Sequence, residues 1–348
     1  MFPGFATEER TAAFASRFPE AAVAGFFRTA QSLTVSTVGI GTYLGPIDDA
    51  TDEAYTRSIE RALASGVNFI DTSLNYRHQR SERAISRALE NWVREGGGAR
   101  DEVVLCTKAG YLVPDAIPVG KLSAGDVVGG MHCLHPAFLD DQLERSRRNL
   151  GLDTIDVFYL HNPETQLAYI SPEAFYARIR KAFEFLEQQV EAGAIRYYGA
   201  ATWDGFRRGG DARSLSLAGM SEIARDVAGA THHFRFIQLP VNLAMTEALS
   251  RPLEQGRTVL DLAAEVGITA VSSASLLQAR LSRGLPDEIA QAMPGTLTDA
   301  QRAIQFTRSA PGVAVALVGM SSPAHVDENL GVSRIAPLDV GAFRQAFA

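Results

Sequence analysis

A regular alternation of short apolar segments with longer amphipathic segments constrains the fold of this chain more than any other feature. The apolar segments have the length of strands and the amphipathic ones show helical periodicity. The expected strands are residues 33–41, 67–71, 103–107, 155–160, 196–200, 235–239, 268–272 and 314–318. The expected helices are residues 52–65, 81–95, 137–149, 173–191, 213–228, 256–266, 298–308 and 323–331. Most of the strands are apolar on both faces, as parallel strands covered by helices are. Eight such units without a linker predict an α/β fold, a single-domain (β/α)8 TIM barrel.

Length and composition agree with a globular protein that has a large core. The chain has 348 residues, enough for one large barrel or for two ordinary domains. Hydrophobic residues make up 46% of it and charged residues 21%, which is typical of globular domains. The formal net charge is -7, and the arginines are scattered along the chain. Nucleic acid and anionic membrane surfaces need a concentrated basic field, so we expect neither as a partner.

The cysteines and the N-terminal sequence favour a cytoplasmic protein. Cys106 and Cys133 are too few for a disulfide framework in a chain of this size. Glu8 and Glu9 interrupt the N-terminal segment where a signal peptide needs an apolar stretch. No run of about 18 apolar residues occurs. We therefore expect a protein without a membrane-spanning helix.

Ionisable residues stand at the ends of three consecutive expected strands. Asp71, Lys108 and His161 each lie where a strand ends, and Tyr76 lies five residues after Asp71 in the following loop. In a (β/α)8 barrel, the loops after the C-terminal strand ends carry the chemistry. Taken singly, Asp71 is explained as a helix cap, Lys108 as a solvated strand end and His161 as a hydrogen-bonded core residue. Together, at equivalent places of successive strands, they indicate an active site.

Six motifs in the same order resemble those of the aldo-keto reductase family. They are "DTSLNY" with the Ser81-Glu82 pair after it, "CTK", "YLH", "AGAIRYYGAATW", "FIQLPVNL" and "LVGMSSPAHVDENL". The resemblance extends over residues 33–332, nearly the whole chain. It implies a catalytic tetrad made of Asp71, Tyr76, Lys108 and His161.

The resemblance implies an NAD(P)-dependent oxidoreductase that interconverts an alcohol and a carbonyl group of an aldehyde, ketone or sugar. Hydride addition leaves negative charge on the carbonyl oxygen, where a proton must arrive. Tyr76 is expected to deliver this proton as general acid. The ammonium of Lys108, held by Asp71, is expected to lower the phenol pKa from about 10. His161 is expected to orient the carbonyl by a hydrogen bond, and the same groups serve alcohol oxidation in reverse.

A nicotinamide cofactor follows from the same resemblance, because protein side chains contain no hydride source. The resemblance favours NADP(H) over NAD(H) and implies no metal. The residues that it implies as cofactor contacts are Gly41, Thr42, Tyr43, Asp71, Thr202, Gln238, Ser273, Ser275, Leu276, Gln278, Arg280, Gly319, Ser321, Ser322, His325, Glu328 and Asn329. Gln238 would contact the nicotinamide. Ser321 would either contact the adenosine phosphate at a helix start or simply cap that helix.

Four positions differ from the usual pattern of the family. Thr202 follows Ala201 where a Ser-Asn pair commonly grips the carboxamide, so its hydroxyl is expected to replace part of that grip. Ser273 stands where a Tyr usually stacks on the nicotinamide. His325, with no adjacent Lys, stands where an Arg often contacts the 2′-phosphate, so we expect modest discrimination between NADPH and NADH. Asn162 replaces a common aromatic residue and predicts a more polar substrate pocket.

A long segment rich in Gly and Pro, residues 110–136, follows the third expected strand. We expect it to form an ordered extended loop over the barrel mouth. His132, Cys133 and His135 lie in this segment, but a fourth ligand with suitable spacing for zinc is absent. We therefore expect no metal site.

The N-terminal residues precede the family resemblance. We expect residues 1–30 to be an N-terminal extension and residues 31–348 to form the barrel oxidoreductase domain. The extension would form either a helix across the barrel bottom or a contact in a homo-oligomer.

Two alternatives remain open from the sequence. The stretch "GIGTYLG" nearly matches a dinucleotide-binding fingerprint, but its third Gly is one position late and no helix follows directly. The functional alternative is a catalytically slow barrel that binds a nicotinamide nucleotide as a redox sensor for a protein partner. Turnover of a carbonyl substrate favours the enzyme, whereas tight cofactor retention without turnover favours the sensor.

Overall fold

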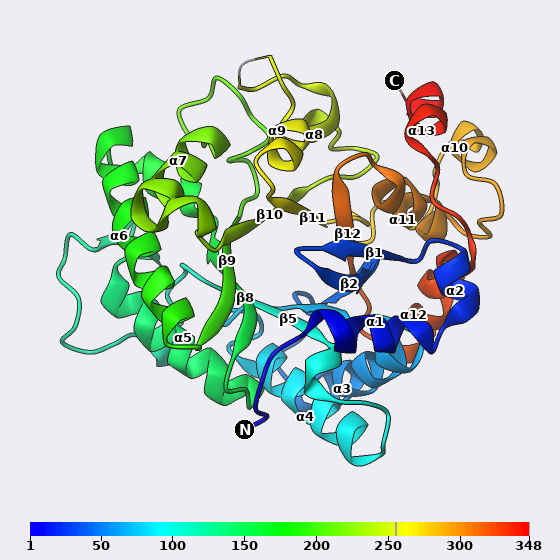
Figure 1. The fold of residues 1–348 in the computed structure, drawn as a ribbon, viewed down its shortest axis with the longest axis horizontal. Coiled ribbons are helices and arrows are strands. Elements are labelled where there is room, and N and C mark those ends of the chain that lie inside the picture. The colour runs from blue at the N-terminus through cyan, green and yellow to red at the C-terminus, as the bar shows by residue number, and fades with distance from the viewer. Residues whose placement is uncertain (255, 348) are drawn as a thin grey trace.

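A closed barrel of eight parallel strands forms the centre of the molecule (Figure 1). The computed structural model describes residues 1–254 and 256–347. The barrel strands are β3 (Val38–Gly41), β4 (Phe69–Asp71), β5 (Val104–Ala109), β8 (Ile155–His161), β9 (Ile195–Ala201), β10 (Phe234–Pro240), β11 (Thr269–Ser273) and β12 (Val313–Gly319). They follow one another around the barrel in chain order, and β12 pairs with β3 to close it. The predicted (β/α)8 barrel is confirmed.

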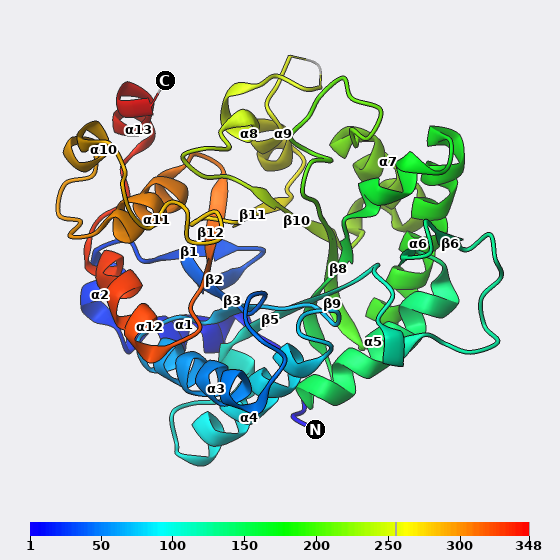
Figure 2. The same cartoon turned by 180° about the vertical axis from the view of Figure 1, so that it is seen from behind.

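Helices surround the barrel on its outside (Figure 2). The helices that follow the barrel strands are α3 (Asp49–Ala64), α4 (Arg80–Arg94), α5 (Pro136–Leu150), α6 (Pro172–Glu191), α7 (Leu217–Ala228), α9 (Val259–Glu265), α11 (Asp299–Ser309) and α12 (Pro323–Asn329). Further short helices are α8 (Glu247–Ser250), α10 (Asp287–Ala292) and α13 (Val340–Phe347), with 3-10 turns at Arg100–Glu102, Pro114–Ala116, Pro163–Ala168, Gly229–Thr231 and Leu330–Arg334. Within the described residues, the helices are too short or too polar to span a membrane.

The expected helices and strands overlap the observed ones. They differ in where some helices begin and in the division of one expected strand. The segment expected as one strand, residues 33–41, is divided into β2 (Leu33–Ser36) and β3. The division occurs because β2 pairs antiparallel with β1 (Phe27–Ala30), whereas β3 pairs in the barrel. The helix expected from residue 213 begins at Leu217, since the Ser216 side chain caps it by accepting a hydrogen bond from the Gly219 amide.

Side chains alternate between the barrel interior and the helix layer along each strand. Phe69, Cys106 and Tyr159 belong to a cluster inside the barrel. Ile70 and Phe158, their neighbours in sequence, pack into the larger cluster between strands and helices. This period of two decides which residues at the strand ends point into the barrel.

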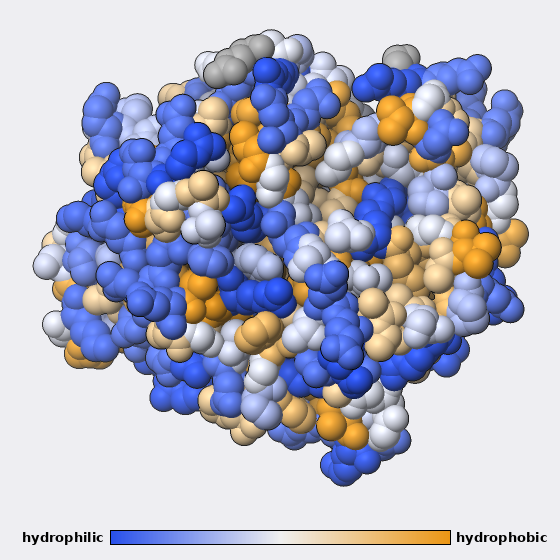
Figure 3. Space-filling view, viewed as in Figure 1, coloured by the Kyte–Doolittle hydropathy of each residue, from blue (hydrophilic) through white to orange (hydrophobic). Residues whose placement is uncertain are grey.

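The N-terminal segment closes the bottom of the barrel. Besides β1, it forms α1 (Glu8–Ser16) and α2 (Pro19–Val23). The Ala6 amide donates to an Asp156 carboxylate oxygen at 2.7 Å, and Ala30 belongs to the cluster inside the barrel. The face that carries this segment is mostly hydrophilic (Figure 3). The β1–β2 hairpin and Ala6 contribute side chains to the cluster inside the barrel, whereas α1 packs to one side, with the Phe14 ring against Trp92 on α4. The division into an extension (1–30) and a barrel domain (31–348) stays a prediction.

The long segment after β5 runs mainly along the outside of the barrel. It contains a two-stranded ribbon of β6 (Val127–Val128) and β7 (His132–Cys133). Arg178 on α6 donates to the Gly125 carbonyl at 2.6 Å, and Gln142 on α5 donates to the Ala116 carbonyl at 2.6 Å. The segment therefore extends beside α5 and α6 (Figure 2), and its residue at the cavity in the barrel mouth is Tyr111.

Candidate active site

A cavity of about 590 Å³ opens at the C-terminal ends of the strands. Asp71, Tyr76 and His161 line it, together with residues that follow β3, β9, β11 and β12. The alternation along the strands explains this convergence. Asp71, Lys108 and His161 each stand two residues after a side chain of the inner cluster, so all three point into the barrel.

Lys108 and Asp71 form a buried ion pair beneath the cavity. The Lys108 Nζ lies 2.5 Å from Asp71 Oδ1 and donates to the Thr72 carbonyl at 2.7 Å. The other Asp71 oxygen accepts from Gln238 Nε2 at 2.9 Å. Burial by itself lowers the pKa of Lys108, but Asp71 and Tyr76 together outweigh burial, so the pKa is raised. Lys108 is therefore held as an ammonium.

The Tyr76 hydroxyl lies 3.4 Å from Lys108 Nζ, and the ammonium sits 4.8 Å from the Tyr76 ring centroid. The net direction of the Tyr76 pKa differs from the expectation. Burial raises the pKa of Tyr76 by more than the ammonium of Lys108 lowers it, so the phenol stays protonated at neutral pH. Lys108 acts in the expected direction but only offsets part of the effect of burial.

His161 faces the same cavity as a neutral imidazole. Burial, with Lys108 and His132 nearby, holds its pKa well below the usual range. The His161 Nδ1 lies 3.1 Å from the Ser73 hydroxyl. Among the residues that the structure describes, its Nε2 has no hydrogen-bond partner, so this atom is available to a ligand.

His132 supports His161 through the backbone. Its Nε2 donates to the His161 carbonyl at 2.7 Å, and its Nδ1 accepts from Gln166 Nε2 at 2.9 Å. Both ring nitrogens are thereby engaged. Across residues 1–254 and 256–347, no three His, Cys, Asp or Glu side chains are grouped so that they could hold a metal ion.

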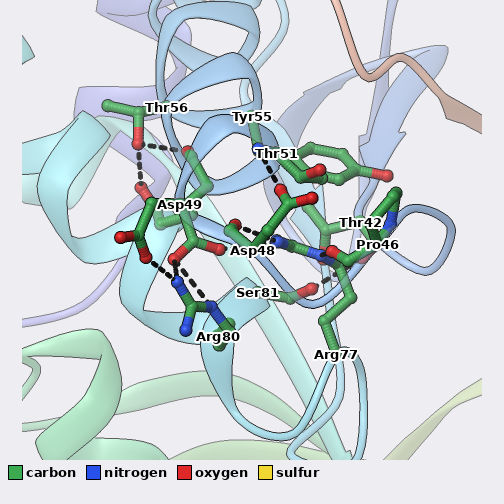
Figure 4. Close-up of polar contacts among 12 residues, drawn as sticks. Thr42, Pro46, Asp48, Asp49, Thr51, Tyr55, Thr56, Arg77, Arg80 and Ser81 are labelled. Carbon is green, nitrogen blue, oxygen red and sulfur yellow. Dashed lines mark hydrogen bonds and ion pairs between the residues drawn. The ribbon is translucent and has the colours of Figure 1, made fainter.

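A buried arginine directly after Tyr76 joins the two loops beside the cavity (Figure 4). The Arg77 guanidinium donates to the Pro46 carbonyl at 2.8 Å and to Asp52 Oδ1 at 2.7 Å. Residues 77–79 adopt φ angles of +48°, +50° and +70°, the left-handed region that non-glycine residues rarely adopt. Tyr55 on α3 donates to the Leu44 carbonyl at 2.6 Å. These contacts hold the loop after β3 against the loop that carries Tyr76.

Most of the residues expected at the cofactor lie on the cavity wall. Those that line it are Gly41, Thr42, Tyr43, Asp71, Thr202, Gln238, Ser273, Ser275, Leu276, Gln278, Gly319, Ser321 and His325. Those that do not line it are Arg280, Ser322, Glu328 and Asn329. The Ser322 hydroxyl instead caps α12 by accepting from the His325 amide at 3.3 Å.

Two hydroxyl groups on the cavity wall are buried and lack a hydrogen-bond partner within the described residues. They are Thr202 Oγ1 and Ser275 Oγ. Buried polar groups in proteins are almost always paired, so an orphaned pair beside a cavity indicates a ligand with polar groups. The cofactor contacts expected of Thr202 and Gln238 stay predictions; of the Gln238 carboxamide, the Nε2 donates to Asp71.

The sequence reasoning missed several residues of the wall. Tyr111 and Asn75 follow the ends of β5 and β4, and Trp203 follows the end of β9. Their position after strand ends was a usable signal, because every loop at this end of a (β/α)8 barrel contributes to the mouth. The role of Arg77 had no such signal, since Arg77 lies in the loop after β4 and its partner Asp52 lies on α3.

Two curated proteins are similar in sequence to about half of this chain. The chain is 28% identical over 172 residues to the aldo-keto reductase yakc [NADP(+)] of Schizosaccharomyces pombe, which covers 49% of this chain and 42% of that protein. It is 25% identical over 174 residues to the uncharacterized oxidoreductase YrpG of Bacillus subtilis, covering 50% of this chain and 48% of that protein. Each alignment therefore spans less than half of the relative.

Solved structures resemble the fold over almost the whole chain. An aldo/keto reductase from Klebsiella pneumoniae, in complex with NADP and acetate, superposes with a TM-score of 0.64 at 21% identity and covers 92% of this chain and 93% of its own. The glycerol dehydrogenase AKR11B4 from Gluconobacter oxydans gives a TM-score of 0.63 at 19% identity, with 92% and 94% covered. The sequence model of the Aldo/keto reductase family matches residues 37–216, more than half of the chain. This chain therefore belongs to the aldo/keto reductase family.

Proposed function

We propose that the protein is an NADP(H)-dependent oxidoreductase that interconverts a carbonyl compound and an alcohol, with Tyr76 as general acid and base. One observation carries the proposal: the Tyr76 hydroxyl lies 3.4 Å from Lys108 Nζ, which is itself 2.5 Å from Asp71 Oδ1. Tyr76 and His161 line one cavity, and within the described residues the His161 Nε2 has no hydrogen-bond partner. This is the arrangement that proton delivery to a carbonyl oxygen needs.

The residues around the cavity fit a nicotinamide nucleotide. Within the described residues, Thr202 and Ser275 offer buried hydroxyls without partners, and the backbone at Gly41 and Gly319 is open on the cavity wall. Solved neighbours from Klebsiella pneumoniae hold NADP or NADPH, and the fission-yeast relative carries NADP(+) in its name. These observations support NADP(H) as the cofactor. When bound, the nicotinamide ring supplies or takes up the hydride.

The protein side chains handle the substrate oxygen and the proton. In reduction, the carbonyl oxygen lies between Tyr76 Oη and His161 Nε2 and gains negative charge as the hydride arrives. Tyr76 gives up its proton to that oxygen, and Lys108 stabilises the phenolate that remains. Burial has kept the phenol protonated until this moment, so it is a proton donor in the resting site. In oxidation, the phenolate accepts the proton from the alcohol.

Turnover of carbonyl compounds tests this proposal. We expect oxidation of NADPH, followed by its absorbance, with at least some members of a panel of aldehydes, ketones and sugars. Tight NADPH binding without turnover of any member would overturn the proposal in favour of a redox sensor. The relatives are named as oxidoreductases and aldo-keto reductases and give the sensor no support.

A further inference from the structure

We propose that Glu164 is a positioning residue of the active site, which ties the loop after β9 to the segment after β8. The loop after β9 carries Thr202 and Trp203, and the segment after β8 follows His161 directly. This inference rests on the proposed function, because Thr202 and Trp203 line the cavity proposed for cofactor and substrate. Glu164 itself does not line that cavity, so it acts through the loop that does.

The hydrogen bonds of the barrel end where the contacts of Glu164 begin. The Thr202 amide still donates to a carbonyl of β10, at 2.8 Å. The next three amides all donate to one oxygen of Glu164, Oε1; they are those of Trp203 at 2.8 Å, Asp204 at 3.2 Å and Gly205 at 3.3 Å. Successive backbone amides that converge on one point form a concave binding site for a negative charge. Glu164 therefore determines the path of the chain immediately after Thr202.

The carboxyl group of Glu164 is buried in a closely packed place. Glu164 is 5% exposed. Burial raises the pKa of its carboxyl, and the hydrogen bonds from the three amides oppose this rise. Gly205 gives the side chain room, since a Cβ atom added there would lie 3.3 Å from the Glu164 Cβ and 3.0 Å from the Leu215 side chain. A neutral side chain would avoid the cost of burying an ionisable group, so the carboxyl is explained by the backbone that it holds.

A second buried side chain holds the same loop from its other side. The Arg207 Nε donates to the Trp203 carbonyl at 3.1 Å. Its two terminal nitrogens pair with Asp204 in the loop and with Glu247 at the start of α8, each at 2.6 Å. The Trp203 amide thus binds Glu164, while its carbonyl binds Arg207. The backbone is fixed on both sides of a residue whose side chain reaches the cavity.

Fixing this loop fixes two groups on the cavity wall. The Thr202 hydroxyl, which is buried and has no partner among the described residues, is the group proposed for the cofactor, and Trp203 stands next to it. A group that is held in place before binding loses less conformational freedom when the ligand arrives. Loss of Glu164 should therefore weaken cofactor binding. The proton donor Tyr76 lies on another loop and should still function.

Two substitutions of Glu164 test the inference through the affinity for NADPH. Glu164→Leu removes the acceptor of all three amides, so the dissociation constant for NADPH should rise by about tenfold. Glu164→Gln keeps a neutral acceptor, so the dissociation constant should rise less, by about threefold. With NADPH and carbonyl substrate both saturating, kcat of the two variants should remain within about threefold of wild type, because the tetrad is intact.

Glu102, before β5, offers a matched control at the other end of the barrel. It is also 5% exposed, and its carboxylate binds Arg10, Arg17 and the Ala99 amide. Glu102→Leu and Glu102→Gln should lower the melting temperature and leave the dissociation constant for NADPH unchanged. The same outcome for the Glu164 variants, a lower melting temperature with unchanged NADPH affinity, would show a purely structural role and overturn the inference.

Acrylamide quenching of tryptophan fluorescence tests the position of the loop without turnover. Trp203 is 40% exposed, whereas the second tryptophan of the chain, Trp92, is 6% exposed, so quenching reports mainly on Trp203. The quenching constant should be larger in Glu164→Leu than in wild type, and an unchanged constant would contradict the inference. Should Glu164→Leu not fold, Glu164→Gln decides, and an NADPH affinity equal to that of Glu102→Gln would overturn it. If no carbonyl compound is turned over, the proposed function fails, while NADPH affinity and quenching still test Glu164.

Discussion

The ammonium of Lys108 is shared between the carboxylate of Asp71, at 2.5 Å, and the hydroxyl of Tyr76, at 3.4 Å. In the proposed mechanism, Asp71 therefore acts on Tyr76 through the lysine and not on the substrate. The pair is almost inaccessible to water, so each partner depends on the other for its charge.

Replacing the carboxylate should make the lysine titrate at lower pH. In Asp71→Asn, burial continues to lower the pKa of Lys108, but the opposing effect of the carboxylate is gone. The Lys108 ammonium should therefore lose its proton at a lower pH than in the wild type. We expect the alkaline limb of the kcat profile to move to lower pH. Asp141→Asn, which loses an ion pair with Arg145 on α5, should leave the profile in place. Identical profiles for Asp71→Asn and wild type would refute this role.

The unpaired hydroxyl of Thr202 gives a prediction in which stability and binding change differently. Thr202→Val removes a buried polar atom that has no partner in the described structure, so thermal stability should stay the same or rise by up to about 1 kcal/mol. NADPH binding should weaken by about three- to tenfold, the equivalent of one hydrogen bond. Titration calorimetry and thermal unfolding check the two effects. Lower thermal stability with unchanged NADPH affinity would show that the Thr202 hydroxyl has a structural role and does not contact the cofactor.

Arg77 is expected to position Tyr76 through the loop that they share. Arg77→Ala should lower kcat/KM by about tenfold or more, because the loop after β4 loses its attachment to the loop after β3. Arg80→Ala is the matched control, since Arg80 also pairs with Asp52 but stands on α4. If both variants lose the same activity for the same loss of melting temperature, Arg77 has only a structural role.

His132 should make the protein less stable in acid. Burial lowers the pKa of His132 to about 4, whereas the unfolded chain takes up the proton near the ordinary value of 6.5. The free energy of unfolding should therefore fall as the pH decreases from about 6.5 to about 4, by on the order of 3 kcal/mol from this residue. Urea unfolding at pH 7 and pH 4.5 measures it. The loss should be smaller in His132→Asn and unchanged in His78→Asn, which alters an exposed imidazole; equal losses in all three proteins would exclude His132.

The sequence allowed a good prediction of the barrel and of the residues at its strand ends. Asp71 and Lys108 stand at the ends of apolar segments that the sequence predicts as strands. In a barrel, the alternation of side chains along each strand is enough to predict that both side chains point into the barrel mouth. The role of Arg77 could not be predicted, because it depends on contacts with Asp52 on α3 and with Pro46 in the loop after β3. The expected lowering of the Tyr76 pKa is wrong for a similar reason. The sequence identifies the neighbouring ammonium of Lys108, but it does not give the burial of Tyr76, which raises the pKa by more than Lys108 lowers it.

The same limit explains the long segment after β5. Its Gly and Pro content predicts an extended loop, but the path of the loop depends on Arg178 and Gln142, which bind its carbonyls from α6 and α5. Composition contains no information about these partners. Of the residues in this segment, Tyr111 is the one that lines the cavity.

The most direct test of the central claim is the Tyr76→Phe variant, which removes the proton donor and keeps the ring against Tyr43 and His161. At saturating NADPH and with any carbonyl compound that the wild type reduces, kcat should fall by ~10²–10⁴, the contribution of a positioned general acid. The dissociation constant for NADPH should remain within about threefold of the wild-type value, since the hydroxyl serves the substrate. A kcat within about threefold of wild type, with cofactor binding intact, would contradict the assignment of Tyr76 as general acid and with it the proposed mechanism.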